Sequence, residues 1–213
     1  MLEFGFRSRG ASGAAFPTIA ASGANATVLH YAESTAQLKQ GDLLLIDAGA
    51  RYQMYCGDIT RTVPVSGKFS SQQRELYDVV LAAHDAAIAA VAPGLPVDGI
   101  HQAARQVLLD GLIQLRYLKD EQRHDDAALK QFYPHKTSHW LGLEVHDVGV
   151  YTREHEQMLL QPGMVLTIEP ALYLAELGIG IRIEDDLLVT ANGHEVLTAA
   201  LPSDAHAIEA MRQ

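Results

Sequence analysis

The 213-residue sequence predicts an α+β fold in which an antiparallel sheet is backed by helices on one face. Strand-like segments come first, two helical patterns follow, and strand-like segments then return. A glycine followed six residues later by a carboxylate also occurs twice, as Gly41 with Asp47 and as Gly163 with Glu169. This repeat indicates two related halves. Because no linker-like stretch separates them, residues 1–213 are expected to form one domain with internal pseudo-symmetry.

The first half begins with weak signals and ends with strong ones. Residues 1–21 contain no strong element, apart from a start that resembles the end of a helix. Residues 22–25 have turn chemistry, and 27–31 are predicted to form a short strand. The apolar run 43–47 predicts a strand whose partner is expected within 54–65.

Two helices are expected in the middle of the chain. Ser70 and Gln73 have capping-box spacing and predict a helix start. An apolar stripe of helical period follows and ends before the turn at 93–96. A second helix is expected to begin near Asp98, and residues 119–130 to form a loop or short helix.

The last third of the sequence is predicted to return to strands, before a short C-terminal tail or helix. The expected elements are an extended segment at 145–151, strands at 164–169 and 181–189, and a hairpin turn at Asn192-Gly193 before 195–198.

The composition excludes several classes of protein. A net charge of −10, from 16 basic and 26 acidic residues, argues against a nucleic-acid or anionic-membrane partner. Cys56 is the only cysteine, which excludes an internal disulfide and fits a reducing compartment. No signal peptide opens the chain and no apolar run has membrane-spanning length, so the cytoplasm is the expected location.

Four carboxylates follow or accompany the predicted strands, namely Asp47, Asp58, Glu169 and Glu184. A carboxylate buried without a partner at the end of an apolar run costs much free energy. A carboxylate in a solvated turn at the end of a strand would avoid that cost, and for any one of the four residues this alternative stays open. Four carboxylates in a matched pattern favour a site for hard or borderline divalent metals.

Four of the 10 histidines have apolar or aromatic neighbours in sequence, namely His30, His135, His139 and His146. The spacing of His135 and His139 would put them on one face of a strand. The other six are expected to be ordinary surface residues: His84, His101, His124, His155, His194 and His206. A hydrogen-bonded core histidine remains the alternative for any one of the first four.

Other catalytic patterns are weaker. Cys56 has no histidine close in sequence and is expected to be an inert buried thiol. The Ser-Gly pairs at 22–23 and 66–67 lack the surroundings of a nucleophile elbow, and no glycine-rich phosphate loop occurs.

Three segments, 22–31, 137–149 and 178–186, together with the carboxylates and His139, carry a resemblance that covers nearly the whole chain. The sequence resembles the pita-bread metallopeptidases, a group that includes methionine aminopeptidase, prolidase and aminopeptidase P. It is most similar to aminopeptidase P, which removes an N-terminal residue that precedes proline. The resemblance implies a pita-bread fold with a curved antiparallel sheet, and peptides with N-terminal Xaa-Pro as substrates.

The resemblance also implies roles for individual residues. It implies two divalent metal ions, usually Mn²⁺, bridged by Asp58 and Glu184. Asp47 would complete one metal's ligands, and His139 and Glu169 those of the other. Glu169 would also handle the proton of the attacking water. His30, His135 and His146 would contact substrate and stabilise the tetrahedral intermediate, and Arg182 would hold the carboxylates in the substrate-binding region.

Two departures from the family are expected to matter. Full-length aminopeptidases P carry an N-terminal domain that this sequence lacks, so the substrate entrance and any homo-oligomer are left open. Lys136 stands where many relatives have glycine.

Two alternative functions also remain. One is a prolidase, which takes dipeptides, and the other is a catalytically weak or silent peptide-binding module.

Overall fold

Two three-stranded antiparallel sheets form the two halves of the molecule, in a computed structural model that describes residues 1–153 and 156–211. The first sheet has the order β2-β3-β6, with β2 at Ile19–Ser22, β3 at Leu43–Ala48 and β6 at Ile59–Pro64. The second has the order β13-β12-β9, with β9 at Val165–Ile168, β12 at Asp185–Thr190 and β13 at Gly193–Val196. The strands predicted at 43–47 and 164–169 are therefore present, and β2 was missed. The strand predicted at 195–198 lies two residues earlier, at β13.

The repeated glycine has a backbone reason. Gly41 and Gly163 have φ angles of +90° and +93°, a region that residues with a Cβ rarely adopt. Each glycine turns the chain into the strand that follows, and each strand then delivers a carboxylate at its far end, Asp47 in β3 and Glu169 just after β9.

The halves join along β6 and the start of β12. The backbone N–H of Glu184 donates to the Thr60 carbonyl at 3.0 Å, and the Thr62 hydroxyl donates to the Arg182 carbonyl at 3.0 Å. The prediction of one strand over 181–189 is wrong, because β11 (Ile179–Arg182) ends before β12 begins. Between β11 and β12, the Ile183 N–H donates to the Pro170 carbonyl and the Glu184 N–H to Thr60 of β6 in the other half of the molecule.

Smaller antiparallel sheets complete the strand layer. β10 (Ala171–Leu174) pairs with β11. The other two sheets consist of β1 (Gly13–Ala14), β4 (Ala50–Tyr52) and β5 (Tyr55–Cys56), and of β7 (Thr152–Arg153) with β8 (Glu156–Gln157).

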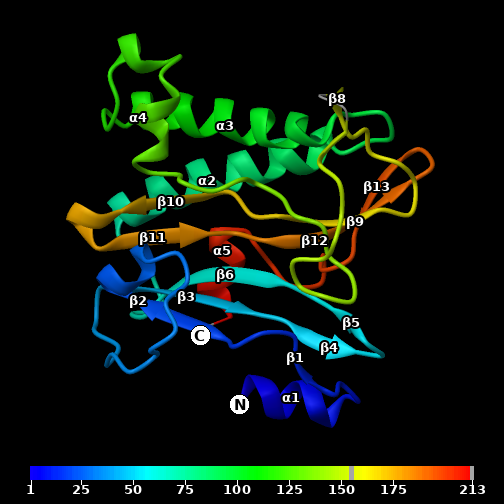
Figure 1. Ribbon diagram of the computed structural model, residues 1–213. Helices are drawn as coiled ribbons and strands as arrows, with labels where there is room; N and C mark the ends of the chain where they lie inside the picture. The colour runs from blue at the N-terminus through cyan, green and yellow to red at the C-terminus, as the bar shows by residue number, and fades with distance from the viewer. Residues whose placement is uncertain (154–155, 212–213) are drawn as a thin grey trace.

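Two long helices, α2 (Ser71–Ala90) and α3 (Val97–Gln114), lie together on one face of the strands (Figure 1). The expected capping box is confirmed, since the Ser70 hydroxyl accepts from Gln73 N–H and the Gln73 side chain accepts from Ser70 N–H. The remaining helices are short, α1 (Leu2–Ser8), α4 (Asp126–Lys130) and α5 (Ala205–Ala210), with single 3₁₀ turns at Asp120–Gln122 and Ala175–Leu177. Within the described ranges, each helix is too short or too polar to cross a lipid bilayer.

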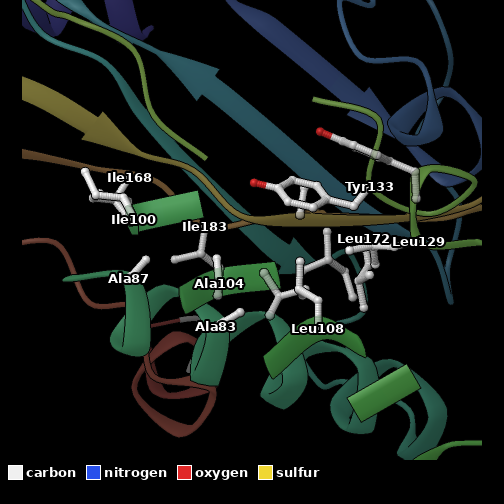
Figure 2. Close-up of a cluster of buried hydrophobic side chains, with 14 of the residues drawn as sticks. Ala83, Ala87, Ile100, Ala104, Leu108, Leu129, Tyr133, Ile168, Leu172 and Ile183 are labelled. Carbon is white, nitrogen blue, oxygen red and sulfur yellow. The ribbon is translucent and has the colours of Figure 1, made fainter. Parts of the chain in front are cut away.

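The main core lies between these helices and the strands of the second half. Figure 2 shows Ala83 and Ala87 of α2 and Ala104 of α3 facing Ile183 and Leu172, all fully buried. The alanines let the helices approach the sheet closely, and the branched side chains fill the space between. This layer forms the rigid support for the second sheet.

Two extended segments predicted from the sequence are absent. Residues 23–27 form a 3₁₀ helix, η1 (Gly23–Thr27), and no strand is assigned at 27–31 or at 145–151. A contact with a strand distant in the sequence accounts for the conformation of η1. This 3₁₀ helix packs against β11 so closely that Gly180 of β11 has no room for a side chain. A Cβ on Gly180 would lie 2.0 Å from the Ala26 carbonyl oxygen.

Gly180→Ala is therefore expected to lower the free energy of unfolding by about 1–3 kcal/mol, the usual cost of overpacking. Gly5→Ala is the matched control, since its Cβ would meet its nearest neighbour at 3.6 Å in ordinary contact. Urea unfolding of both variants measures the difference. Equal stability of the two variants would contradict the close approach of η1 and β11.

Candidate metal centre

A cavity of about 210 Å³ opens where the two sheets meet, and all nine site residues expected from the sequence lie on its walls. These residues are His30, Asp47, Asp58, His135, His139, His146, Glu169, Arg182 and Glu184. Leu29, Lys136 and Ser138 complete the lining. Residues more than 150 positions apart in the sequence thus line one pocket.

The sheet topology explains why the carboxylates converge. Asp47 is the second-last residue of β3, and Asp58 directly precedes β6. Glu169 directly follows β9 and Glu184 directly precedes β12, so these two stand at the same end of an antiparallel pair. Asp47, Asp58 and Glu184 are buried, with 8%, 5% and 2% exposure. The Glu169 side chain is less buried, with 17% exposure.

His139 is held beside the carboxylates by its backbone and by its ring. Residues 137–141 run along the free edge of β9, with the Thr167 N–H donating to the His139 carbonyl at 3.0 Å. The His139 Nδ1 lies 3.0 Å from the Trp140 carbonyl, which only accepts, so Nδ1 carries a proton. The Nε2 atom lies 3.5 Å from Asp58 Oδ2 and 3.8 Å from Glu169 Oε1. A backbone carbonyl on one nitrogen and a free lone pair on the other is the usual arrangement of a metal-binding histidine.

Burial and mutual repulsion disfavour the charged forms of these carboxylates. Burial, reinforced by the Asp58 charge and opposed by Arg182, raises the pKa of Asp47 to about 6. Burial raises the pKa of Glu169 to about 7, although His139 and Arg182 oppose the shift. Burial and the charges of Asp58, Glu169 and Asp47 raise the pKa of Glu184 well above its usual value. The positive charge of the neighbouring side chains therefore does not balance the negative charge of the four carboxylates when all are ionised.

The residues present fit divalent metal ions. Among the described residues, Asp47 Oδ1 and Asp58 Oδ1 are buried without a hydrogen-bond partner. The nearest ligand atoms of Asp58, His139 and Glu184 lie within 4.8 Å of one another. Unpartnered carboxylate oxygens beside an imidazole lone pair are the donors that borderline divalent cations select, and a bound cation would remove the repulsion.

Thr60 and Tyr173 were missed from the sequence but connect these groups. The Arg182 guanidinium donates to Asp47 Oδ2 at 2.6 Å, to the Thr60 hydroxyl at 3.0 Å and to the Tyr173 hydroxyl at 2.8 Å. The Thr60 hydroxyl in turn donates to Glu184 Oε2 at 2.6 Å. The two-residue period of Asp58, Thr60 and Thr62 along one strand face could have identified Thr60. No comparable signal marks Tyr173.

Tyr173 also orients His135. The His135 Nδ1 lies 2.8 Å from the Lys136 carbonyl and so carries a proton, which leaves Nε2 to accept from the Tyr173 hydroxyl at 3.1 Å. Burial lowers the pKa of His135 to about 3, so the ring is neutral. No strand contains both His135 and His139, so the shared strand face that their spacing allowed is not formed; pairing with the β9 segment begins only at Thr137.

His30 and His146 stand at the exposed rim of the cavity. The His146 ring meets the His139 ring edge-on, with centroids 4.5 Å apart. Both rim histidines also line a second cavity of about 250 Å³, which reaches Asp47 and Asp58. Its other walls are largely apolar and come from Phe16, Pro17, Ile19, Ala32 and Val145. A polar cleft with an apolar side pocket is thus built around the carboxylates.

Three of the six histidines expected at the surface are not ordinary surface residues. His84 is 2% exposed, with Nε2 3.1 Å from Asp185 Oδ2. His101 and His194 are half-buried and bond to the Thr137 hydroxyl and the Val91 carbonyl. These partners lie far away in the sequence and could not be read from it. His124 and His206 are exposed as expected, and His155 lies outside the described residues.

Known proteins are similar to this chain in sequence and in fold. Residues 1–191 match the model of metallopeptidase family M24. An Escherichia coli Xaa-Pro aminopeptidase is 44% identical over 216 residues, an alignment that covers 97% of this chain and 49% of that protein. The Pseudomonas aeruginosa aminopeptidase PepP has a TM-score of 0.95 at 44% identity, over 99% of this chain and 50% of that one. Aminopeptidase P from E. coli with the inhibitor Pro-Leu has a TM-score of 0.94 at 43% identity, with the same coverage.

The chain spans about half the length of the curated relatives and solved structures that it matches. Within that half, the two sheets and the backing helices follow the pita-bread fold of the aminopeptidase P structures. The match to the family model covers most of the sequence, and the fold agrees over its whole length. The chain therefore belongs to metallopeptidase family M24.

Proposed function

We propose that residues 1–213 form a catalytic domain that releases the N-terminal residue from peptides with proline at the second position. One observation carries the proposal. Four carboxylates and a tautomerically fixed histidine share one cavity, in a chain 44% identical to an Xaa-Pro aminopeptidase. The single cysteine and acidic charge fit a cytoplasmic enzyme acting on peptides rather than on nucleic acids or membranes.

The proposed cofactor is a pair of divalent metal ions. Asp58 and Glu184 would bridge the two ions, Asp47 would bind one, and His139 and Glu169 the other. Four carboxylates and an imidazole exceed the three protein ligands typical of a one-metal hydrolytic site. Oxygen donors with a single imidazole favour manganese over zinc. When bound, the metals supply Lewis acidity that polarises the scissile carbonyl and lowers the pKa of a water.

The chain's own residues supply proton transfer and substrate contacts. Glu169 lines the cavity, with Oε1 3.8 Å from His139 Nε2, and is the proposed base that takes a proton from the attacking water. His146 and His30 stand at the rim, where their N–H groups can donate to substrate carbonyls. His135, held neutral and fixed by Tyr173, offers a rigid flat wall. Arg182 bonds to Asp47 and keeps that carboxylate aimed into the site.

A prolyl peptide bond suits these walls. It has no N–H, so the enzyme must recognise the shape of the ring and the flanking carbonyls. Imidazoles present both a flat apolar face and an N–H donor, and the apolar side pocket adjoins them. The proposed selectivity therefore depends on the three histidines rather than on a bond to the scissile nitrogen.

Hydrolysis of an Xaa-Pro-Yaa tripeptide by Mn²⁺-loaded protein tests the proposal. Release of free Xaa from the tripeptide, with little release from an Xaa-Ala-Yaa control, is expected. Cleavage of Xaa-Pro dipeptides alone would favour a prolidase instead. Tight peptide binding without cleavage, in protein shown to contain metal, would favour the silent binding module.

Metal binding is expected to stabilise the fold. A free metal concentration a hundredfold above Kd adds about 2.7 kcal/mol to the free energy of unfolding. For a chain of this size, that raises Tm by roughly 5–10 °C. The control is the double variant Asp58→Asn with Glu184→Gln, which removes the bridging charges and the repulsion together. Calorimetry with and without Mn²⁺ measures both proteins, and an equal rise in the control would contradict binding at this site.

A further inference from the structure

A second arginine lies behind the metal centre, outside the cavity. Arg61 belongs to β6 and is 7% exposed. A guanidinium has five N–H donors, and each one here has an acceptor. Nε donates to the Pro202 carbonyl at 3.0 Å, Nη1 to the Thr60 and Glu184 carbonyls at 3.0 and 2.6 Å, and Nη2 to Asp185 Oδ1 and the Leu201 carbonyl, both at 2.8 Å.

These contacts fix the backbone on both sides of Glu184. Its N–H donates to the Thr60 carbonyl at 3.0 Å, and its carbonyl accepts from Arg61. Glu184 itself lies between β11 and β12, where no strand ladder holds the chain. The direction of its carboxylate therefore depends on these two bonds and on the Thr60 hydroxyl at 2.6 Å.

Asp185 anchors the guanidinium in turn. Its Oδ1 accepts from Arg61 Nη2 and from the Thr198 hydroxyl, and its Oδ2 lies 3.1 Å from His84 Nε2. His84 is on α2, and the segment containing Leu201 and Pro202 leads to α5. The buried group of Arg61, Asp185 and His84 thus links both sheets to α2 and the C-terminal segment.

We propose that Arg61 is a positioning residue for the metal centre. Through the Glu184 carbonyl and Asp185, it holds the Glu184 carboxylate toward Asp58 without contacting substrate or metal. This inference rests on the proposed metal site. A purely structural role is the competing explanation, in which Arg61 only ties residues 201–202 to the domain.

Two matched variants separate these roles. Arg61→Lys keeps a positive charge opposite Asp185, but an ammonium has three donors at one point and cannot reach all five acceptors. Tyr77→Phe loosens the same C-terminal segment, because the Tyr77 hydroxyl donates to the Ser203 carbonyl at 2.7 Å, yet it leaves Glu184 untouched. Mn²⁺ is titrated into each metal-free protein by calorimetry, alongside wild type, and Tm and kcat are measured on the same samples.

Arg61→Lys is expected to weaken Mn²⁺ binding by roughly 10–100-fold, the usual cost of losing a group that supports metal ligands. Tyr77→Phe is expected to lower Tm and leave the Mn²⁺ Kd unchanged. An unchanged Kd in Arg61→Lys, or an equal loss in Tyr77→Phe, overturns the positioning role. If Arg61→Lys does not fold, Asp185→Asn replaces it, with a Kd increase of about tenfold expected and an unchanged Kd overturning the inference.

The wild-type arm keeps this inference distinct from the proposed function. Wild-type protein that binds Mn²⁺ but cleaves no Xaa-Pro peptide contradicts the function, while the Kd ratio still decides the role of Arg61. Wild-type protein that binds no metal contradicts both.

Discussion

Replacing Glu169 with glutamine is expected to lower kcat on an Xaa-Pro-Yaa peptide by about 10²–10⁴-fold, the range for loss of a general base. An amide cannot take a proton from water, and it is a weaker metal ligand than a carboxylate. Of the cavity carboxylates, Glu169 has the most exposed side chain, at 17% against 12% for Asp47 and 7% for Asp58. Asp47 and Glu184 also already accept hydrogen bonds from Arg182 and from the Thr60 hydroxyl. We therefore do not expect a neighbouring carboxylate to take over as the base in the Glu169→Gln variant.

The fold is expected to tolerate this change. Without metal, burial already raises the pKa of Glu169 to about 7, so the neutral form that glutamine imitates is accessible. The bond from Glu169 N–H to the Thr137 carbonyl is made by the backbone and survives the substitution. Tm, metal content and kcat are measured on one sample, with Glu144→Gln as the control, because the Glu144 side chain is 67% exposed. Wild-type turnover in a metal-loaded Glu169→Gln variant would show that another group acts as the base.

Local sequence signals predicted the parts of the fold that depend on local chemistry. The Ser70–Gln73 capping box and the hairpin turn near Asn192 are short-range patterns; the capping box is present, and the turn lies one residue earlier than expected, because Gly193 already pairs with Thr190 as the first residue of β13. The glycines before β3 and β9 are also local, since each has a positive φ that few other residues adopt. The matched carboxylates could be found because each glycine fixes where its strand begins.

The failures lie where distant contacts override local preference. Residues 27–31 contain strand formers, yet η1 ends beside β11 and the chain turns there. The break between β11 and β12 arises because Glu184 bonds to Thr60, 124 positions away. His84 looked like a surface residue of a helix, but Asp185 lies against it, 101 positions later. A sequence pattern read within a window of 10 to 20 residues holds no information about contact partners that lie more than 100 positions away.

Removing the His146 side chain is the second large effect expected. His146→Ala should lower kcat by about 10²–10³-fold, the usual cost of one lost donor to a tetrahedral intermediate. The ring stands at the exposed rim, shared by the carboxylate cavity and the apolar pocket, where a substrate carbonyl would pass. Burial, and secondarily the His139 ring, lowers the pKa of His146, so its N–H is offered by a neutral ring.

The competing role for His146 is structural, because its ring packs edge-on against His139 with centroids 4.5 Å apart. A supporting ring would act by holding His139 in place, so its loss would lower metal content or Tm and leave the turnover of folded, metal-loaded molecules unchanged. Trp140 and Tyr151 stack on each other with centroids 5.5 Å apart, so they keep a partner when His146 is removed. Measuring kcat, bound Mn²⁺ and Tm on one preparation, with exposed His124→Ala as the control, separates the two roles. A fall in kcat at full metal occupancy and unchanged Tm supports the donor role, whereas lost metal with normal turnover per loaded molecule contradicts it.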